Sequence, residues 1–104
     1  MTDLTLSSEQ EGDRTVLVVA GEIDMQTAGL LRRHVTDLGV DAGTLVLDLE
    51  GVGFVDSSGL GALVGIKKQQ EKGGGQLLIG RLSQPVARLF EITNMTHVFA
   101  RTDA

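Results

Sequence analysis

The side chains with the clearest chemical potential lie in one short stretch, Asp56-Ser57-Ser58-Gly59. This stretch stands between an apolar run and a segment with helical spacing, so the serines are predicted to occupy the first turn of a helix. Backbone amides there have no intrahelical acceptor, and the aligned peptide dipoles give that end partial positive charge. We therefore expect a hydroxyl near solvent, at a position where an attached phosphate would be locally favoured.

Three interpretations of this stretch compete. Aspartate and serine are common at helix starts, and local chemistry alone favours simple capping. Phosphorylation is the second interpretation, because it would add about −1.5 to −2 charges and three acceptor oxygens. Catalysis is the weakest, because neither serine stands in a Gly-x-Ser-x-Gly nucleophile elbow. His34, among the arginines of a predicted helix, and His97, near the C-terminal edge, are expected to be surface or packing side chains rather than triad members.

Alternating strands and helices are predicted to position the serines. Residues 4–8 and 15–20 favour two strands around a tight turn at residues 11–13, which indicates an antiparallel hairpin. The pattern then predicts a helix over residues 25–39, a buried strand over 44–49, a helix over 57–72, a short strand over 76–79, a helix after Ser83 and an edge strand over 97–99. This order is typical of an α/β domain with a mixed, mostly parallel sheet. We expect one domain over residues 1–104, with residues 1–3 and 101–104 frayed.

Individual residues are predicted to begin and end these helices. Asp24 or Thr27 is suited to cap the first helix, and Gly39 fits its end. Ser83 is expected to cap the third helix, and Asn94 to adopt a left-handed conformation after it. Leu60, Leu63, Val64 and Lys67 are predicted to share one face of the second helix, and Lys67, Lys68 and Glu71 are predicted to be solvated.

Composition excludes several classes of function. The net charge is −5, the basic residues are scattered and aromatic residues make up 3%, which argues against a nucleic-acid partner. The chain has no cysteine and only two distant histidines, so neither a disulfide nor a metal site is expected. No apolar run approaches the ~20 residues that cross a bilayer, and the N-terminus does not resemble a signal peptide. We expect a cytoplasmic protein with no membrane partner and no cofactor.

Three blocks of the chain match one protein family in order and spacing. They are VVAGEIDMQTAGLLR, VLDLEGVGFVDSSGLGALVGIKKQQEKGG and FEITNMTHVF. In these blocks the chain resembles the STAS domains, the group that includes bacterial anti-sigma factor antagonists. One departure is Asn94, where many members have glycine, but asparagine tolerates the left-handed conformation.

The resemblance implies roles for particular residues. In the family, the second serine of the Asp-Ser-Ser-Gly-Leu-Gly core is phosphorylated, which corresponds to Ser58 here, while Ser57 shares the loop without being the acceptor. The aspartate of the Gly-Glu-Ile-Asp block lies near that serine and helps to bind the partner, which corresponds to Asp24. The partner-binding residues implied are Asp24, Asp56, Ser57, Ser58, Gly59, Leu60 and Gly61.

The resemblance also implies partners. One would be an anti-sigma factor that is itself a serine kinase, which binds the unmodified antagonist, releases its sigma factor, phosphorylates the antagonist and dissociates. A serine phosphatase would reset the cycle, and ATP and Mg²⁺ would belong to the kinase. The chain would be a binder and a substrate, not an enzyme, and it is expected to be a monomer or a weak dimer. The alternative is a STAS scaffold or transporter-regulating subunit without a phosphorylation switch.

Overall fold

The elements follow one another in the sheet in the same order as in the chain. The computed structural model describes residues 3–102. Its elements are β1 (Leu4–Glu11), β2 (Arg14–Ile23), α1 (Ala28–Leu38), β3 (Thr44–Val55), α2 (Ser57–Lys72), β4 (Gln76–Leu82), α3 (Gln84–Ile92) and β5 (Ala100–Arg101). The strand order is β1-β2-β3-β4-β5; β1 is antiparallel to β2 and each later pair is parallel. The predicted α/β fold, hairpin and mostly parallel sheet are confirmed.

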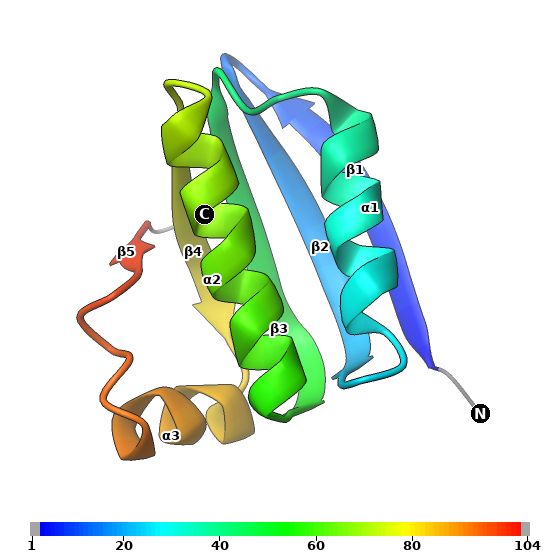
Figure 1. The fold of residues 1–104 in the computed structure, drawn as a ribbon, viewed down its shortest axis with the longest axis vertical. Coiled ribbons are helices and arrows are strands. Elements are labelled where there is room, and N and C mark those ends of the chain that lie inside the picture. The colour runs from blue at the N-terminus through cyan, green and yellow to red at the C-terminus, as the bar shows by residue number, and fades with distance from the viewer. Residues whose placement is uncertain (1–2, 103–104) are drawn as a thin grey trace.

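The core lies between the sheet and the two longer helices. Figure 1 shows α1 and α2 side by side against the same face of the sheet, with α3 across the end at which α2 begins. Leucine, valine and isoleucine fill this layer; Leu17, Leu47 and Leu63 are fully buried. Burying a side chain of this size contributes roughly 1.5–3 kcal/mol, so aliphatic packing alone can hold the helices on the sheet.

The longer strands all extend beyond their predicted ends: β1 ends at Glu11, β2 at Ile23 and β4 at Leu82. The strand predicted over residues 44–49 continues to Val55; the prediction stopped early because Glu50, Gly51 and Gly53 interrupt the apolar run. The edge strand predicted over residues 97–99 is also wrong, since β5 is Ala100–Arg101. Phe99 is instead buried, and its ring stacks on Phe90 of α3 with 5.3 Å between centroids. Packing of this ring therefore decides where the last strand begins.

The predicted bounds of α2 are confirmed, but its predicted apolar face is rotated. The buried residues of this helix are Gly59, Ala62, Leu63, Ile66 and Gln70. Leu63 is buried as predicted, but Leu60 and Val64 are only half-buried. Lys67 forms an ion pair of 2.6 Å with Glu71, as expected for solvated side chains. The small residues on the inner side let the helix backbone approach the sheet closely, an effect that a hydrophobicity pattern does not register.

The predicted residues that end α1 and follow α3 agree with the observed backbone, but α1 begins at Ala28 and not at residue 25. Gly39 ends α1 with a left-handed φ of 65°, and Asn94 has φ 61° after α3. Ser83 caps α3 by accepting a hydrogen bond from the amide of Val86. Thr27 occupies the N-cap position of α1, but its hydroxyl caps no amide of the helix: it donates to the Glu22 carbonyl at 2.7 Å and accepts from the Asp24 amide at 2.9 Å.

The two chain ends were expected to be frayed. Residues 1–2 and 103–104 lie outside the described residues. The carbonyl of Asp3 accepts a hydrogen bond from Glu22 at 2.9 Å, and the amide of Thr102 donates to Ile79 at 3.0 Å. Across residues 3–102 no helix has both the length and the apolar composition that crossing a bilayer requires.

The opposite face of the sheet carries a charged cluster. Asp48 alternates with the core residues Leu47 and Leu49, so its side chain points away from the helices. It is nevertheless only 5% exposed, because Arg81 lies against it with Nη2 2.7 Å from Oδ2. This hydrogen bond, together with the charges of Asp48 and Glu50, raises the pKa of the Arg81 guanidinium. The cluster holds β3 to β4 on this side.

Candidate functional site

The carboxyl ends of β2 and β3 place two aspartates at the same edge of the sheet. Ile23 and Val55 are paired in the parallel ladder, and Asp24 and Asp56 are the residues that follow them. The amide of Asp56 also donates to the Ile23 carbonyl at 3.2 Å, which continues the pairing one residue beyond the strands. The carboxyl edge of a parallel sheet is where α/β folds commonly bind ligands. The backbones of two aspartates distant in sequence therefore leave the sheet side by side at the start of α2.

Asp56 caps α2. Its backbone is extended, and its Oδ1 accepts a hydrogen bond of 2.9 Å from the amide of Gly59. The capping predicted for this residue is confirmed. The amides of Ser57 and Ser58 have no acceptor among the described residues. The helix dipole adds partial positive charge at this end. Together with that charge, the two free N–H groups form an environment suited to an anion.

The two serines differ in exposure. Ser57 is exposed, whereas Ser58 is half-buried and keeps part of its surface accessible. Neither hydroxyl forms a hydrogen bond with another described residue. Both hydroxyls are therefore free of hydrogen bonds to other described residues. Ser58 packs partly against the rest of the domain, whereas Ser57 is exposed.

Asp24 holds the loop between β2 and α1 in shape. Its Oδ1 accepts hydrogen bonds from the amides of Gln26 at 2.9 Å and Thr27 at 3.1 Å, and its own amide donates to the Thr27 hydroxyl at 2.9 Å. The carboxylate is half-buried, and its Oδ2 has no partner among the described residues. Asp24 therefore has a structural role in the loop and still presents one unpaired oxygen at the carboxyl edge.

Contacts within the chain explain one of the two glycines near the start of α2 but not the other. A Cβ on Gly59 would lie 2.2 Å from the Ile23 carbonyl oxygen, so glycine is required where the helix contacts the end of β2. A Cβ on Gly61 would meet nothing within 4 Å, so no contact inside the chain explains glycine there. Leu60, between them, is half-buried against the core. The seven residues predicted as a partner surface come from two segments that meet at one end of the molecule.

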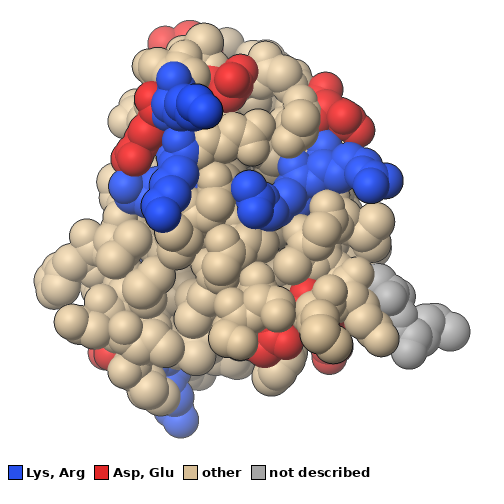
Figure 2. All heavy atoms as spheres, viewed as in Figure 1, with Lys and Arg blue, Asp and Glu red and all other residues tan. Residues whose placement is uncertain are grey.

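Two exposed apolar side chains next to these residues in sequence were missed by sequence reasoning. Met25 follows Asp24 and is 79% exposed, and Phe54 precedes Asp56 by two residues and is 49% exposed. Phe54 lies in an apolar run that predicts burial, and only the alternation with buried Val55 at the end of β3 turns it outward. Figure 2 shows lysine and arginine gathered over the upper half of the helix-bearing face, while the lower half, where α2 begins, is mostly uncharged. Methionine and aromatic side chains are enriched in protein-binding surfaces.

The site offers no grouping suited to a metal. Asp24 and Asp56 each commit one oxygen to backbone amides. Within residues 3–102 no three histidine, aspartate or glutamate side chains come close enough together to hold an ion. What this surface can do chemically is present a hydroxyl, free amides and apolar side chains to another macromolecule.

Comparisons with known proteins identify the family of this chain. The family model for the STAS domain matches residues 5–104. An anti-sigma-B factor antagonist of Bacillus subtilis (strain 168) is 39% identical over 80 residues, which cover 77% of this chain and 73% of that protein. The crystal structure of an anti-sigma factor antagonist from Mycobacterium paratuberculosis has a TM-score of 0.83 at 27% identity, covering 98% of this chain and 87% of that one.

A further solved structure shares the fold. The Bacillus cell fate determinant SpoIIAA in its phosphorylated form has a TM-score of 0.68 and covers 94% of this chain and 91% of its own length. At 19% identity it shows the fold alone. Taken with the family model and the more similar relatives, these matches show that the chain belongs to the STAS-domain family of anti-sigma factor antagonists.

Proposed function

We propose that this protein binds an anti-sigma factor through the surface at the start of α2, and that phosphorylation of Ser58 prevents this binding. The relatives named as anti-sigma factor antagonists support the role. The observation that carries the proposal is the position of Ser58, which is half-exposed in the first turn of α2 beside Asp56 and near the loop that holds Asp24.

The unmodified surface is suited to close contact with a partner. Met25 and Phe54 would supply apolar anchors, because large exposed side chains contribute most of the binding energy of many interfaces. Gly61 would let the partner approach the helix backbone, since nothing inside the chain occupies the space above it. The unpaired Oδ2 of Asp24 and the free amides of the serines would offer hydrogen bonds of both kinds.

A phosphate on Ser58 would change this surface without unfolding the domain. The helix end and its free amides would offset part of the added charge, by about 0.3–1 kcal/mol. Across the interface, however, a group that packs against a bare hydroxyl would meet a bulky dianion beside two carboxylates. Like charges brought together in an interface cost several kcal/mol, and each 1.4 kcal/mol is tenfold in affinity. We therefore expect a loss of binding of about a hundredfold or more.

The modifying enzymes follow from the same proposal. The anti-sigma factor would act as the serine kinase, so that binding and modification use one surface, and a serine phosphatase would restore the binding form. SpoIIAA, which shares the fold, has been described in a phosphorylated form. The chain itself would contribute the acceptor hydroxyl and its surroundings, and ATP and Mg²⁺ would be held by the kinase.

The acceptor is tested by mass spectrometry after incubation with the anti-sigma factor of the same organism and ATP. We expect one phosphate, located on Ser58. Ser58→Ala should abolish it, and the matched control Ser57→Ala should retain it. Phosphate on Ser57, or on neither serine, would show that the acceptor is assigned wrongly.

The switch is tested by calorimetric titration with the same anti-sigma factor. Ser58→Asp should weaken binding strongly while the thermal unfolding midpoint stays close to that of the wild type, since the carboxylate lies at a helix N-terminus. Ser57→Asp, one residue away on the exposed side, serves as the charge-matched control and should weaken binding less. Equal affinities for wild type and Ser58→Asp would exclude a charge switch at this position.

A further inference from the structure

The sheet has one long edge that no strand covers. Figure 1 shows β1 along one side of the sheet and β5 along the other. β5 has two residues, and a very short edge strand is a common protection against pairing with another chain. β1 has eight residues, and among the described residues it pairs with β2 alone. The outer edge of β1 is therefore open to a further extended strand.

The free backbone groups of β1 belong to its even-numbered residues. The Glu22 amide donates to the Asp3 carbonyl at 2.9 Å, one step beyond the paired residues Leu4 and Gly21. In an antiparallel pair, residues bonded in this way alternate with residues whose N–H and C=O groups point away from the partner. The odd-numbered residues of β1 therefore bond β2, and the N–H and C=O groups of Leu4 and Leu6 point outward.

A groove borders this edge on the helix side of the sheet. It has a volume of about 340 Å³ and lies between β1 and α1. Its lining includes the apolar side chains of Leu4, Leu6 and Leu30 and one charge of each sign, on Arg33 and Asp37. Both charged residues are exposed, and neither forms an ion pair or hydrogen bond with any other described residue.

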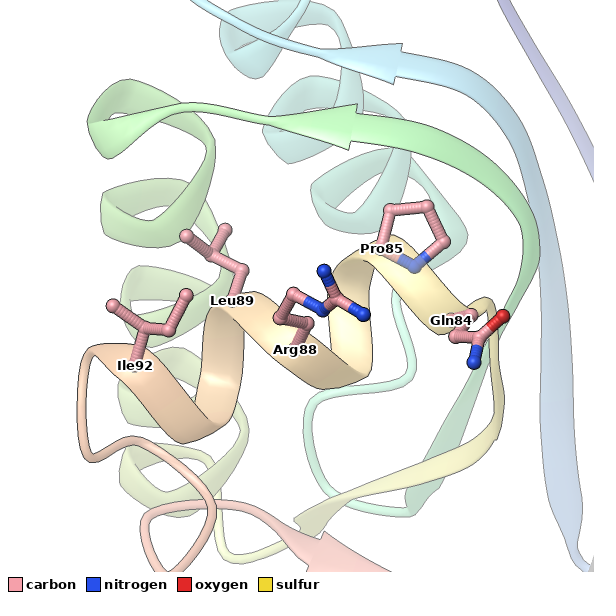
Figure 3. A pocket seen from close by; sticks show the side chains of 5 residues that line it. All are labelled: Gln84, Pro85, Arg88, Leu89 and Ile92. Atoms are coloured by element: carbon pink, nitrogen blue, oxygen red, sulfur yellow. The ribbon is translucent and has the colours of Figure 1, made fainter.

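The groove on α3 differs from this one. It has a volume of about 410 Å³ and is lined by Gln84, Pro85, Arg88, Leu89 and Ile92, all from that helix (Figure 3). Its lining has no free strand backbone, and among these five residues Arg88 alone is charged. The backbone edge beside the β1 groove, by contrast, requires an extended strand, and the β1 groove carries both signs of charge.

We infer that the free edge of β1 pairs with β1 of a second copy of this chain, antiparallel, about a two-fold axis that passes through Thr5. A two-fold interface uses the same patch on both chains, so the patch must complement itself. In this arrangement Leu4 lies opposite Leu6 of the second copy. Each such pair exchanges backbone hydrogen bonds through groups that are free in the single chain.

The side chains of the edge fit this pairing. Leu4 and Leu6 pack toward the core on the helix side, so the axis places apolar residues opposite apolar residues and joins the two grooves. Arg33 and Asp37 of each chain then face a groove that contains the opposite charge. A strand that carries one sign of charge would suit only one of these two residues.

Two glutamates of β1 oppose longer overlaps. Moving the axis one or two residues toward the hairpin turn would put Asp3 opposite Glu9 or Glu11 of the second copy. Like charges directly opposite each other destabilise a strand pair. The axis at Thr5 leaves both glutamates beyond the paired residues 3–7. Because this segment is short and each chain has a net charge of −5, the dimer should form only at high protein concentration.

Disulfide trapping tests the register. The chain has no cysteine, so an introduced one can link only to its own copy. Thr5 would face Thr5 of the second copy at a non-hydrogen-bonded position, where Cα atoms are about 4.5 Å apart and a disulfide fits. In air-saturated buffer, Thr5→Cys should form a covalent dimer at least about tenfold faster than Ser7→Cys, an equally exposed position on the same side of β1. Equal rates would overturn the inference.

Sedimentation equilibrium over a wide range of concentrations tests the symmetry. The wild type should dimerise, and Thr5→Glu and Thr5→Lys should each weaken dimerisation about tenfold or more, because two like charges then meet at the axis. An equimolar mixture of the two variants should associate again, since each glutamate meets a lysine. Thermal unfolding of each variant identifies any loss caused by misfolding.

Two results of this experiment would contradict the inference. One is a wild type that stays monomeric throughout, and the other is a mixture that does not recover. If the Thr5 variants instead weaken binding to the anti-sigma factor and leave self-association unchanged, the edge belongs to that partner and the inference is wrong.

Discussion

The C-terminal end of α2 is hydrogen-bonded to the loop between α1 and β3. At its N-terminal end, by contrast, several amides and hydroxyls have no hydrogen-bond partner among the described residues. After the helix, the amide of Gly75 donates to Gln70 at 2.8 Å and to Asp41 at 3.1 Å. The buried side chain of Gln70 donates to the carbonyls of Val40 at 3.0 Å and Gly43 at 3.2 Å. These contacts join α2 to the loop between α1 and β3.

The N-terminal end of α2 has fewer of its polar groups in hydrogen bonds. Asp56 pairs one amide, while the amides and hydroxyls of Ser57 and Ser58 have no partner among the described residues. Gly61 has open space beside it. These unpaired groups are the ones that the proposed binding surface would use. The following variants test this comparison.

The largest loss of stability is expected from Gly75→Ala. Its Cβ would lie 2.1 Å from the Gly43 carbonyl oxygen and 2.6 Å from that of Asp41, and both are backbone atoms that cannot rotate away. Crowding of this kind typically costs about 1–3 kcal/mol, and we expect the upper part of that range in urea unfolding. Gly29→Ala is the control, because its Cβ would meet nothing within 4 Å. Equal stabilities for the two variants would contradict the packing argument.

A smaller loss is expected from Gln70→Leu. The side chain is fully buried, and its amide donates to two carbonyls of the α1–β3 loop and, at the longer distance of 3.5 Å, to the Gln76 carbonyl. The variant removes the two shorter hydrogen bonds and this longer one at nearly constant volume. We expect about 2 kcal/mol in urea unfolding, because the two bonds contribute about 1 kcal/mol each. Gln69→Leu is the matched control, since the amide of Gln69 makes one exposed hydrogen bond of 3.3 Å to Thr36. A loss as large in the control would show that Gln70 does not hold this loop.

At the N-terminal end, Asp56→Ala should cost about 1 kcal/mol, because it removes the cap on the Gly59 amide. Asp56→Asn keeps an acceptor at the same place and should recover most of the loss. Thermal unfolding of the two variants measures the difference. If asparagine proves as destabilising as alanine, the carboxylate acts through its charge and not as a cap.

The smallest change in stability is expected from Gly61→Ala, and its sign is reversed. Alanine should stabilise the helix by about 0.5–1 kcal/mol, because glycine loses more backbone entropy on folding and no contact opposes the new methyl group. On the proposed function, the same variant should bind the anti-sigma factor several-fold more weakly in calorimetric titration. A variant that is more stable and binds the anti-sigma factor with unchanged affinity would show that the partner does not contact this position.

Local features of the fold were predictable from the sequence. The bounds of α2, the cap by Asp56, the left-handed Gly39 and Asn94 and the N-terminal hairpin all agree with the structure. Each of these depends on residues within a few positions of one another, since caps and turns are short-range hydrogen-bonded units. Membership of the family was likewise predictable, because the three matching blocks span nearly the whole chain.

The tertiary structure decided the features that depend on distant residues. The buried side of α2 follows from how closely Gly59 approaches the end of β2, and β5 begins only after Phe99 has packed on Phe90. The exposure of Met25 and Phe54 depends on where two separate strands end. The sequence alone determines which residues cap, turn and alternate, because those preferences act along the chain. Which side chains are left without partners is determined only when the sheet brings β2 and β3 together.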